Sequence, residues 1–157
     1  MSDVYVVGAD LIKFGRYPDR TPAQLGAEAT LLALDDAGLN IGDVGALYAA
    51  STFNAASMIA QQILFQIGQT GIPCVNVSNA CAAGATAFRE AFIAVKSGLY
   101  DVVVAVGAEK NPAGMLSAGR RQKVYLAQVL CQRCLPRRVY CMQQLTAQPW
   151  SSSPKCR

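Results

Sequence analysis

The sequence alternates short, continuously apolar runs with longer segments whose apolar residues recur every three or four positions. The strand-like runs are residues 4–7, 44–50, 73–77 and 102–106. The helix-like segments between them are residues 21–38, 56–68 and 81–98. Strands that are apolar throughout are typical of sheets covered on both faces, and their alternation with helices favours parallel pairing through right-handed crossovers. We therefore expect an α/β fold with a mainly parallel, mixed sheet flanked by helices.

The ends of the helix-like segments carry their own signals. Thr21 offers a capping hydroxyl directly before Pro22, a residue favoured at the first position of a helix. Gly38, Gly68 and Gly98 follow the last periodic residues of the three segments, as glycines that end helices do. The sequence thus predicts where each of the three helices stops.

Cys81 lies where a strand-like run meets a helix-like run, in PCVNVSNACAAGATAFREAF. Ser78 and Asn79 carry side-chain oxygens that favour a helix start, so we expect a helix to begin near Cys81, with the thiol in its first turn. A helix N-terminus carries about half a positive charge and free N–H groups, which favour a thiolate and a developing oxyanion. The small residues 82–84 leave room for a substrate. On this local pattern, a nucleophile and a small buried apolar residue fit equally well.

A second segment is expected on the same face as Cys81. In parallel sheets, ligands bind beyond the carboxyl ends of the strands, where the Cys81 turn and residues 107–110 should both lie. Glu109 and Lys110 are candidates for the polar groups of a site there. The alternative, which we favour, is that these adjacent opposite charges are solvated or paired locally.

The composition changes abruptly after Met115. The 157 residues are 52% hydrophobic and 15% charged, which is typical of a folded domain. All ten acidic residues lie before residue 116, whereas eight of the 14 basic residues lie after it. Only Cys74 and Cys81 of the six cysteines lie in the first part. We expect one domain over residues 1–115 and a basic, cysteine-containing, irregular tail over residues 116–157.

The tail permits several interpretations. Cys131-x-x-Cys134 with Cys141 and Cys156 would supply four thiolates to zinc, but a second two-residue knuckle is missing, and we predict no metal site. The basic charges are scattered and Trp150 stands alone, which favours a solvated extension over nucleic-acid or anionic-membrane binding. Such a change of composition is also expected from a shifted reading frame or unrelated sequence, so we hypothesise a truncated gene product.

The sequence carries no signal for a membrane or for export. No apolar run approaches the ~18 residues that a membrane-spanning helix needs. The N-terminus also lacks the basic stretch, apolar run and cleavage site of a secretory leader. We therefore expect a cytoplasmic protein without a membrane span.

Four segments resemble the N-terminal half of the thiolase superfamily, which includes acetyl-CoA acetyltransferase-like proteins. Within it, they are closest to the lipid-transfer-protein or sterol-carrier-type thiolases. They are VYVVGADLIKFGRYPDRTPAQLGAEATLLALDDAGL, VGALYAAS, IPCVNVSNACAAGATAFREAFIAVKSGLYD and VVVAVGAEK, in this order over residues 4–110. The resemblance implies the N-terminal half of a layered, thiolase-like fold, with a five-stranded sheet between helices. It also implies that Cys81 is the nucleophile that accepts an acyl group. Residues 1–115 would then be a truncated thiolase-type N-terminal domain, with a tail unlike the family.

The activity implied is acyl transfer from a 3-oxoacyl-CoA or acyl-CoA, or the reverse condensation, through a covalent intermediate on Cys81. Coenzyme A would enter as a thioester substrate, with no tightly bound cofactor. In thiolases, a histidine and a second cysteine from the second half of the fold move the proton, and this chain contains no histidine. We therefore expect a weakly active or inactive acyltransferase.

Two alternatives to this activity stay open. One is a non-catalytic, thiolase-like fragment that acts as a binding or partner subunit. The other is an aldolase-type homologue of the lipid-transfer proteins. The resemblance implies pairing through the strand before Cys81, so we expect a homodimer or a thiolase-like partner subunit.

Overall fold

The computed structural model describes residues 3–13, 15–68, 70–110 and 125–131. The main elements, in chain order, are β1 (Tyr5–Ile12), α1 (Pro22–Ala37), β2 (Ala46–Ala50), α2 (Ile59–Ile67), β3 (Cys74–Val77), α3 (Ala83–Lys96), β4 (Val102–Gly107) and β5 (Tyr125–Cys131). Short 3₁₀ helices, Ile41–Asp43 and Ala55–Ser57, precede β2 and α2. Strands and helices thus alternate through β4, as the sequence predicts.

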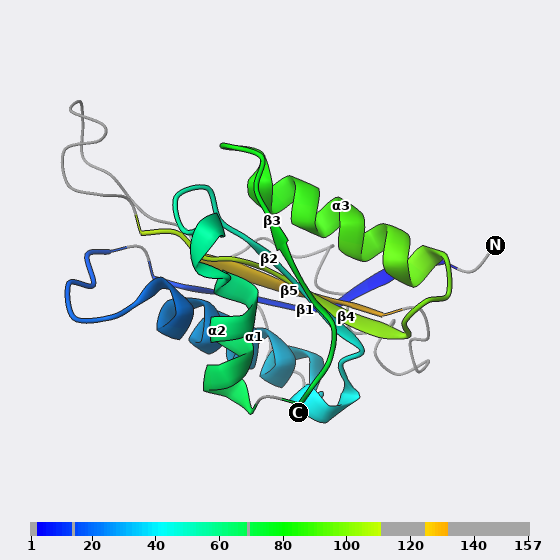
Figure 1. The fold of residues 1–157 in the computed structure, drawn as a ribbon. Coiled ribbons are helices and arrows are strands. Elements are labelled where there is room, and N and C mark those ends of the chain that lie inside the picture. The colour runs from blue at the N-terminus through cyan, green and yellow to red at the C-terminus, as the bar shows by residue number, and fades with distance from the viewer. Residues whose placement is uncertain (1–2, 14, 69, 111–124, 132–157) are drawn as a thin grey trace, which may run out of the picture.

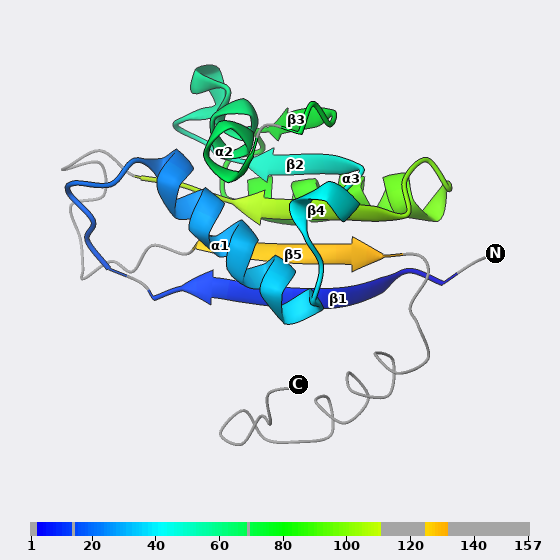
Figure 2. The same ribbon diagram turned by 90° about the horizontal axis from the view of Figure 1, so that it is seen from below.

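The strands form one five-stranded sheet in the order β1-β5-β4-β2-β3 (Figure 2). β2 pairs in parallel with both β3 and β4. β5 lies between β4 and β1 and is antiparallel to both. Helices cover both faces: α3 lies on one, and α1 and α2 lie on the other (Figure 1). The predicted α/β fold, with a parallel set of strands flanked by helices, is confirmed.

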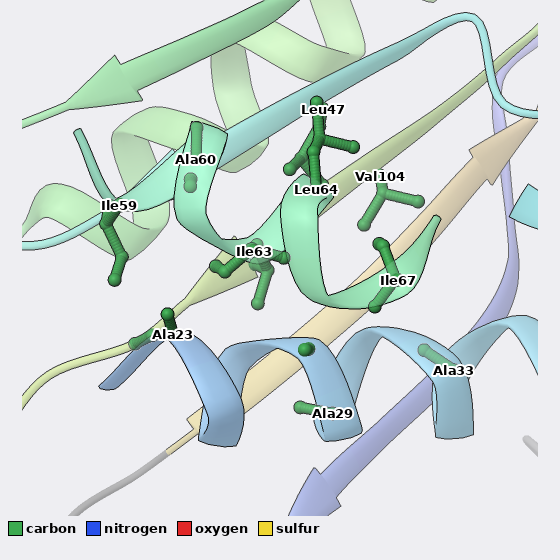
Figure 3. Close-up of a cluster of buried hydrophobic side chains, with 14 of the residues drawn as sticks. Ala23, Ala29, Ala33, Leu47, Ile59, Ala60, Ile63, Leu64, Ile67 and Val104 are labelled. Atoms are coloured by element: carbon green, nitrogen blue, oxygen red, sulfur yellow. The ribbon is translucent and has the colours of Figure 1, made fainter. Parts of the chain in front are cut away.

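One half of the core lies between the sheet and the α1–α2 layer. Figure 3 shows Ile63 and Leu64 of α2 beside Leu47 of β2 and Val104 of β4, with small side chains of α1 on the other side. Leu47, Ile63 and Val104 are fully buried. Burial of a side chain of this size contributes roughly 1.5–3 kcal/mol, so this cluster is a major source of stability.

The other half of the core lies beneath α3 and is built largely from alanines. Ala83, Ala87, Ala91 and Ala94 line the buried side of this helix. All five residues of β2 are buried, since alternate side chains enter the two halves of the core. This burial on both faces explains why β2 is apolar throughout.

The predicted ends of α1 are confirmed. The Thr21 hydroxyl accepts a hydrogen bond from the Gln24 backbone N–H at 3.2 Å, and the Gln24 side chain accepts one from the Thr21 N–H at 2.9 Å. Pro22 is the first helical residue, and Gly38 caps the C-terminus with φ 61°. A left-handed φ is strained for residues with a Cβ, so glycine suits this position.

The strand predicted at residues 4–7 is longer in the structure and continues past Gly8 to Ile12. Gly8 does not end the strand. It lets β1 pack closely against α1, because a Cβ here would lie 2.3 Å from the Ala33 carbonyl oxygen of that helix. The register of β1 against β5 also shifts between Val6 and Gly8. Glycine in a strand often marks such a bulge or close approach.

The prediction of an irregular tail is wrong for Tyr125–Cys131, which form β5 in the middle of the sheet. The physical reason is that β1 and β4 each offer a row of backbone hydrogen-bonding groups, and the run YLAQVLC is apolar enough to enter between them. The rest of residues 116–157 lies outside the described residues.

Candidate active site

Three loops meet at the carboxyl ends of the parallel strands. They are residues 51–54 after β2, residues 78–82 after β3 and residues 108–110 after β4. The Ser51 N–H donates to the Val77 carbonyl at 3.1 Å, and the Ala108 N–H donates to the Ala50 carbonyl at 3.0 Å. The prediction that the Cys81 turn and residues 107–110 lie at one edge of the sheet is therefore confirmed, with the loop after β2 between them.

Cys81 lies in a tight turn that joins β3 to α3, and its side chain is exposed. The preceding residue, Ala80, has a left-handed backbone with φ 44°. The turn is closed by hydrogen bonds from the Ala82 N–H to the Asn79 carbonyl (2.9 Å) and from the Ala83 N–H to the Ala80 carbonyl (3.2 Å). The exposure of Cys81 contradicts the alternative that it is a buried apolar residue.

The helix after Cys81 begins two residues later than predicted. Its first residue is Ala83 and its N-cap is Ala82, so the thiol lies just before the first turn. Ala80 is left-handed and the N-cap residue Ala82 has φ −94° and ψ 6°, so the regular helical backbone starts only at Ala83. The sulfur is thus carried by the turn rather than by the helix.

The predicted cap of this helix by Ser78 or Asn79 is also wrong. No side chain caps α3 at Ala82. Asn79 instead donates its Nδ2 hydrogen to Thr86 Oγ1 at 2.9 Å, and this hydroxyl donates to the Ala82 carbonyl at 3.0 Å. Asn79 therefore ties the turn to the first turn of α3, and the part of the chain that the structure describes gives the helix no side-chain cap.

Glu109 is the centre of a hydrogen-bond cluster between β4 and the loop after β2. Its Oε2 accepts from the backbone N–H groups of Thr52 (2.6 Å) and Phe53 (3.0 Å) and from Ser51 Oγ (3.2 Å). Its Oε1 accepts from Asn54 Nδ2 at 2.5 Å. Hydrogen bonds to a carboxylate are stronger than those between neutral groups, so Glu109 holds this loop in one shape.

The Lys110 side chain joins a different part of the chain from the loop that Glu109 holds. Its Nζ donates to the carbonyls of Pro18 and Arg20, each at 3.0 Å. The expectation that these adjacent charges are solvated or paired locally holds only in part. The Lys110 backbone N–H does donate to Glu109 Oε1 at 3.2 Å, but both side chains also find partners far away in the sequence. Both side chains position loops at the edge of the sheet that carries Cys81.

Thr52 connects the Glu109 cluster to the Cys81 turn. Its backbone N–H is bound by Glu109, and its hydroxyl donates to the carbonyl of Ala80 at 2.8 Å. Sequence reasoning missed Thr52, although a polar run directly after a buried strand is a usable signal. It also missed the left-handed Ala80, for which alanine gives no local signal.

Cys74, at the start of β3, is half-buried, and this burial raises the pKa of its thiol above the ordinary value. The thiolate is the reactive form, so Cys74 is expected to be alkylated slowly at neutral pH and faster as the pH rises toward its raised pKa. Iodoacetamide labelling over a pH series measures this rate. Trypsin leaves Cys74 and Cys81 on one peptide, residues 21–89, so fragmentation must locate the label. Rapid labelling of Cys74 at neutral pH would contradict the prediction.

The other proposed sites fall mainly outside the described residues. Of the tail cysteines, Cys131 ends β5, whereas Cys134, Cys141 and Cys156 lie in the part that the structure does not describe. Within the described ranges, no three His, Cys, Asp or Glu residues are grouped as metal ligands. Among the same residues, every helix is too short or too polar to cross a membrane.

Comparison with known proteins gives a family match and several relatives. The family described as "Thiolase, N-terminal domain" matches residues 4–141, beyond the domain boundary predicted at residue 115. An acetyl-CoA acetyltransferase of Methanothermobacter thermautotrophicus is 39% identical over 114 residues, which are 70% of this chain and 30% of that protein. Sterol carrier protein 2 of Gallus gallus is 35% identical over 123 residues, 74% of this chain and 22% of that protein.

A solved structure has a similar fold. It is the priming β-ketosynthase from the R1128 polyketide biosynthetic pathway, with a TM-score of 0.74 and 19% identity over 85% of this chain and 51% of that one. At this identity, the likeness concerns the fold alone. The chain spans less than a third of the length of the two relatives above and about half of the ketosynthase.

Proposed function

The chain belongs to the thiolase family through its N-terminal domain, and on this premise we propose that Cys81 accepts an acyl group from a coenzyme A thioester. The observation that carries the proposal is the exposed Cys81 thiol at the carboxyl edge of the parallel strands, directly before α3. Ligands of open α/β sheets bind at such an edge. Relatives named acetyl-CoA acetyltransferase support the class of substrate.

The start of α3 supports a site for developing negative charge beside Cys81. Among the described residues no side chain caps this helix, so the partial positive charge of its N-terminus faces the Cys81 turn without a carboxylate or hydroxyl at the N-cap. Such a helix end stabilises a nearby anion, whether a thiolate or the oxyanion formed when the thiolate attacks a carbonyl. Gly84, in the first turn, has open space where a Cβ would lie, which leaves room for the substrate.

The step that we propose is thioester exchange. The Cys81 thiolate attacks the carbonyl carbon of an acyl-CoA and forms a new carbon–sulfur bond. The bond to the coenzyme A sulfur then breaks, and coenzyme A leaves as a thiolate that takes up a proton from water. A thiol has an ordinary pKa of about 8.5, so it leaves without a strong acid beside it. Coenzyme A is thus a substrate in this proposal, with no resident cofactor.

Cleavage of a 3-oxoacyl-CoA is more demanding. There the bond between C2 and C3 breaks, the shortened acyl group stays on Cys81, and the departing acetyl-CoA carbanion needs a proton at C2. Histidine is the commonest general acid–base residue, and the chain contains none. We therefore expect thioester exchange to be faster than carbon–carbon cleavage.

Intact-protein mass spectrometry tests the proposal. The full chain is incubated with acetyl-CoA or acetoacetyl-CoA and quenched in acid, which preserves a thioester. We expect one acyl adduct per chain, fully lost in Cys81→Ala because the accepting sulfur is removed. Cys74→Ala is the matched control and should keep the adduct, since Cys74 lies at the other end of β3.

The absence of an adduct on the native chain would overturn the enzymatic proposal. It would favour the alternative of a non-catalytic subunit, for which the open side of β3 is the supporting observation. β3 is an edge strand that pairs only with β2 among the described strands, and Val75 on it is exposed. An edge of this kind can pair with another chain, in a homodimer or with a thiolase-like partner.

A further inference from the structure

The Cys81 turn contains a conformation that needs support from outside the turn. Ala80, directly before Cys81, has φ 44°. The left-handed region is unfavourable for residues with a Cβ, and such a residue persists only where its surroundings hold it. The Ala83 N–H bound to the Ala80 carbonyl belongs to the same turn and would move with it.

Thr52 gives that support from a neighbouring strand. Its hydroxyl donates to the Ala80 carbonyl at 2.8 Å, a good length for an O–H···O hydrogen bond. This bond spans 28 positions in the sequence, so it fixes the turn relative to the end of β2. The Ala80 peptide group is therefore held from two sides, by Thr52 and by Ala83.

Thr52 is itself held in place. Its N–H donates to Glu109 Oε2 at 2.6 Å, and the same oxygen accepts from the Phe53 N–H at 3.0 Å. Glu109 lies two residues after the end of β4, which is Gly107. A continuous set of hydrogen bonds thus runs across the carboxyl ends of β4, β2 and β3 to the peptide before Cys81.

We propose that Thr52 is a positioning residue for Cys81, whose hydroxyl holds the left-handed Ala80 peptide so that the thiol stays beside the N-terminus of α3. The inference rests on the proposed function of Cys81 as acyl acceptor. Thr52 acts through Ala80 and does not itself touch the acyl group. Loss of the hydroxyl lets the Ala80 backbone relax and carries the sulfur away from the helix end that stabilises its anion.

The test compares Thr52→Val with Thr52→Ser. Valine keeps the shape of threonine and the N–H bond to Glu109 but lacks the hydroxyl, whereas serine keeps the hydroxyl. The rate of Cys81 acylation by acetyl-CoA should fall about fivefold to tenfold in Thr52→Val, the size expected of one hydrogen bond, and Thr52→Ser should restore most of it. The ratio of Cys81 to Cys74 alkylation by iodoacetamide in the same samples should fall in parallel.

The labelling rate of Cys74 distinguishes a change in the position of Cys81 from a general destabilisation of the sheet. A destabilised sheet would expose the half-buried Cys74 and speed its labelling, so the absolute Cys74 rate must stay at the native value in Thr52→Val. If Thr52→Val matches the native chain in both the acylation rate and the labelling ratio, the inference is wrong. If the native chain forms no acyl adduct, the proposed function fails, and the labelling ratio still decides whether Thr52 positions Cys81.

Discussion

Replacing Gly8 with alanine is expected to lower the free energy of unfolding by about 3 kcal/mol, at the upper end of the cost of overpacking a core. A Cβ at Gly8 would lie 2.3 Å from the Ala33 carbonyl oxygen and 2.7 Å from the Ala37 backbone nitrogen. Both are backbone atoms of α1, which cannot turn aside as a flexible side chain can. The helix must therefore move off β1, and the apolar contacts of the α1 layer are loosened with it.

Urea unfolding followed by circular dichroism measures this effect. Gly42→Ala is the matched control, because a Cβ at Gly42 would meet nothing within 4 Å. It should change the free energy of unfolding by less than about 0.5 kcal/mol, as exposed substitutions usually do. Equal stability of the two variants would show that α1 does not pack against β1 as closely as the structure indicates.

Much of the fold could be predicted from the sequence because its signals are local. The Thr21 and Gly38 ends of α1 depend on neighbouring residues alone, and both predictions are confirmed. The position of β5 depends instead on the open edges of β1 and β4, which are distant in the chain. The segment around β5 is rich in arginine, glutamine and cysteine, and this composition does not predict a strand. The short apolar run forms one only between the edges of β1 and β4.

The candidate site was likewise predicted only where its signals are local. The approximate place of Cys81, between a strand and a helix, follows from the sequence and is confirmed by β3 and α3. The left-handed Ala80 depends on Thr52, a residue 28 positions away, and no local pattern predicts it. Glu109 was a candidate for substrate contact, but its hydrogen-bond partners give it a structural role in the loop after β2.

Replacing Glu109 with alanine is expected to lower the free energy of unfolding by about 2 kcal/mol, the scale of hydrogen bonds to a charged group. The substitution leaves the N–H groups of Thr52 and Phe53 and the side chain of Asn54 without their acceptor. The bonds from Thr52 and Asn54 are partly buried, so water replaces the carboxylate there incompletely, whereas the Phe53 N–H is exposed. Glu109→Gln should cost about half as much, because its carbonyl oxygen can still accept from the two backbone N–H groups.

Glu90→Ala is the matched control for this prediction. Glu90 forms an ion pair with Arg89 on the exposed side of α3, and an exposed pair contributes about 0–1 kcal/mol. Urea unfolding should therefore rank the variants with Glu90→Ala closest to the native chain, Glu109→Gln next and Glu109→Ala lowest. A Glu109→Ala chain as stable as Glu90→Ala would mean that the loop after β2 keeps its shape without the carboxylate. Thr52 would then keep its position without the hydrogen bond to Glu109, and the Cys81 turn would depend on the Thr52 hydroxyl alone.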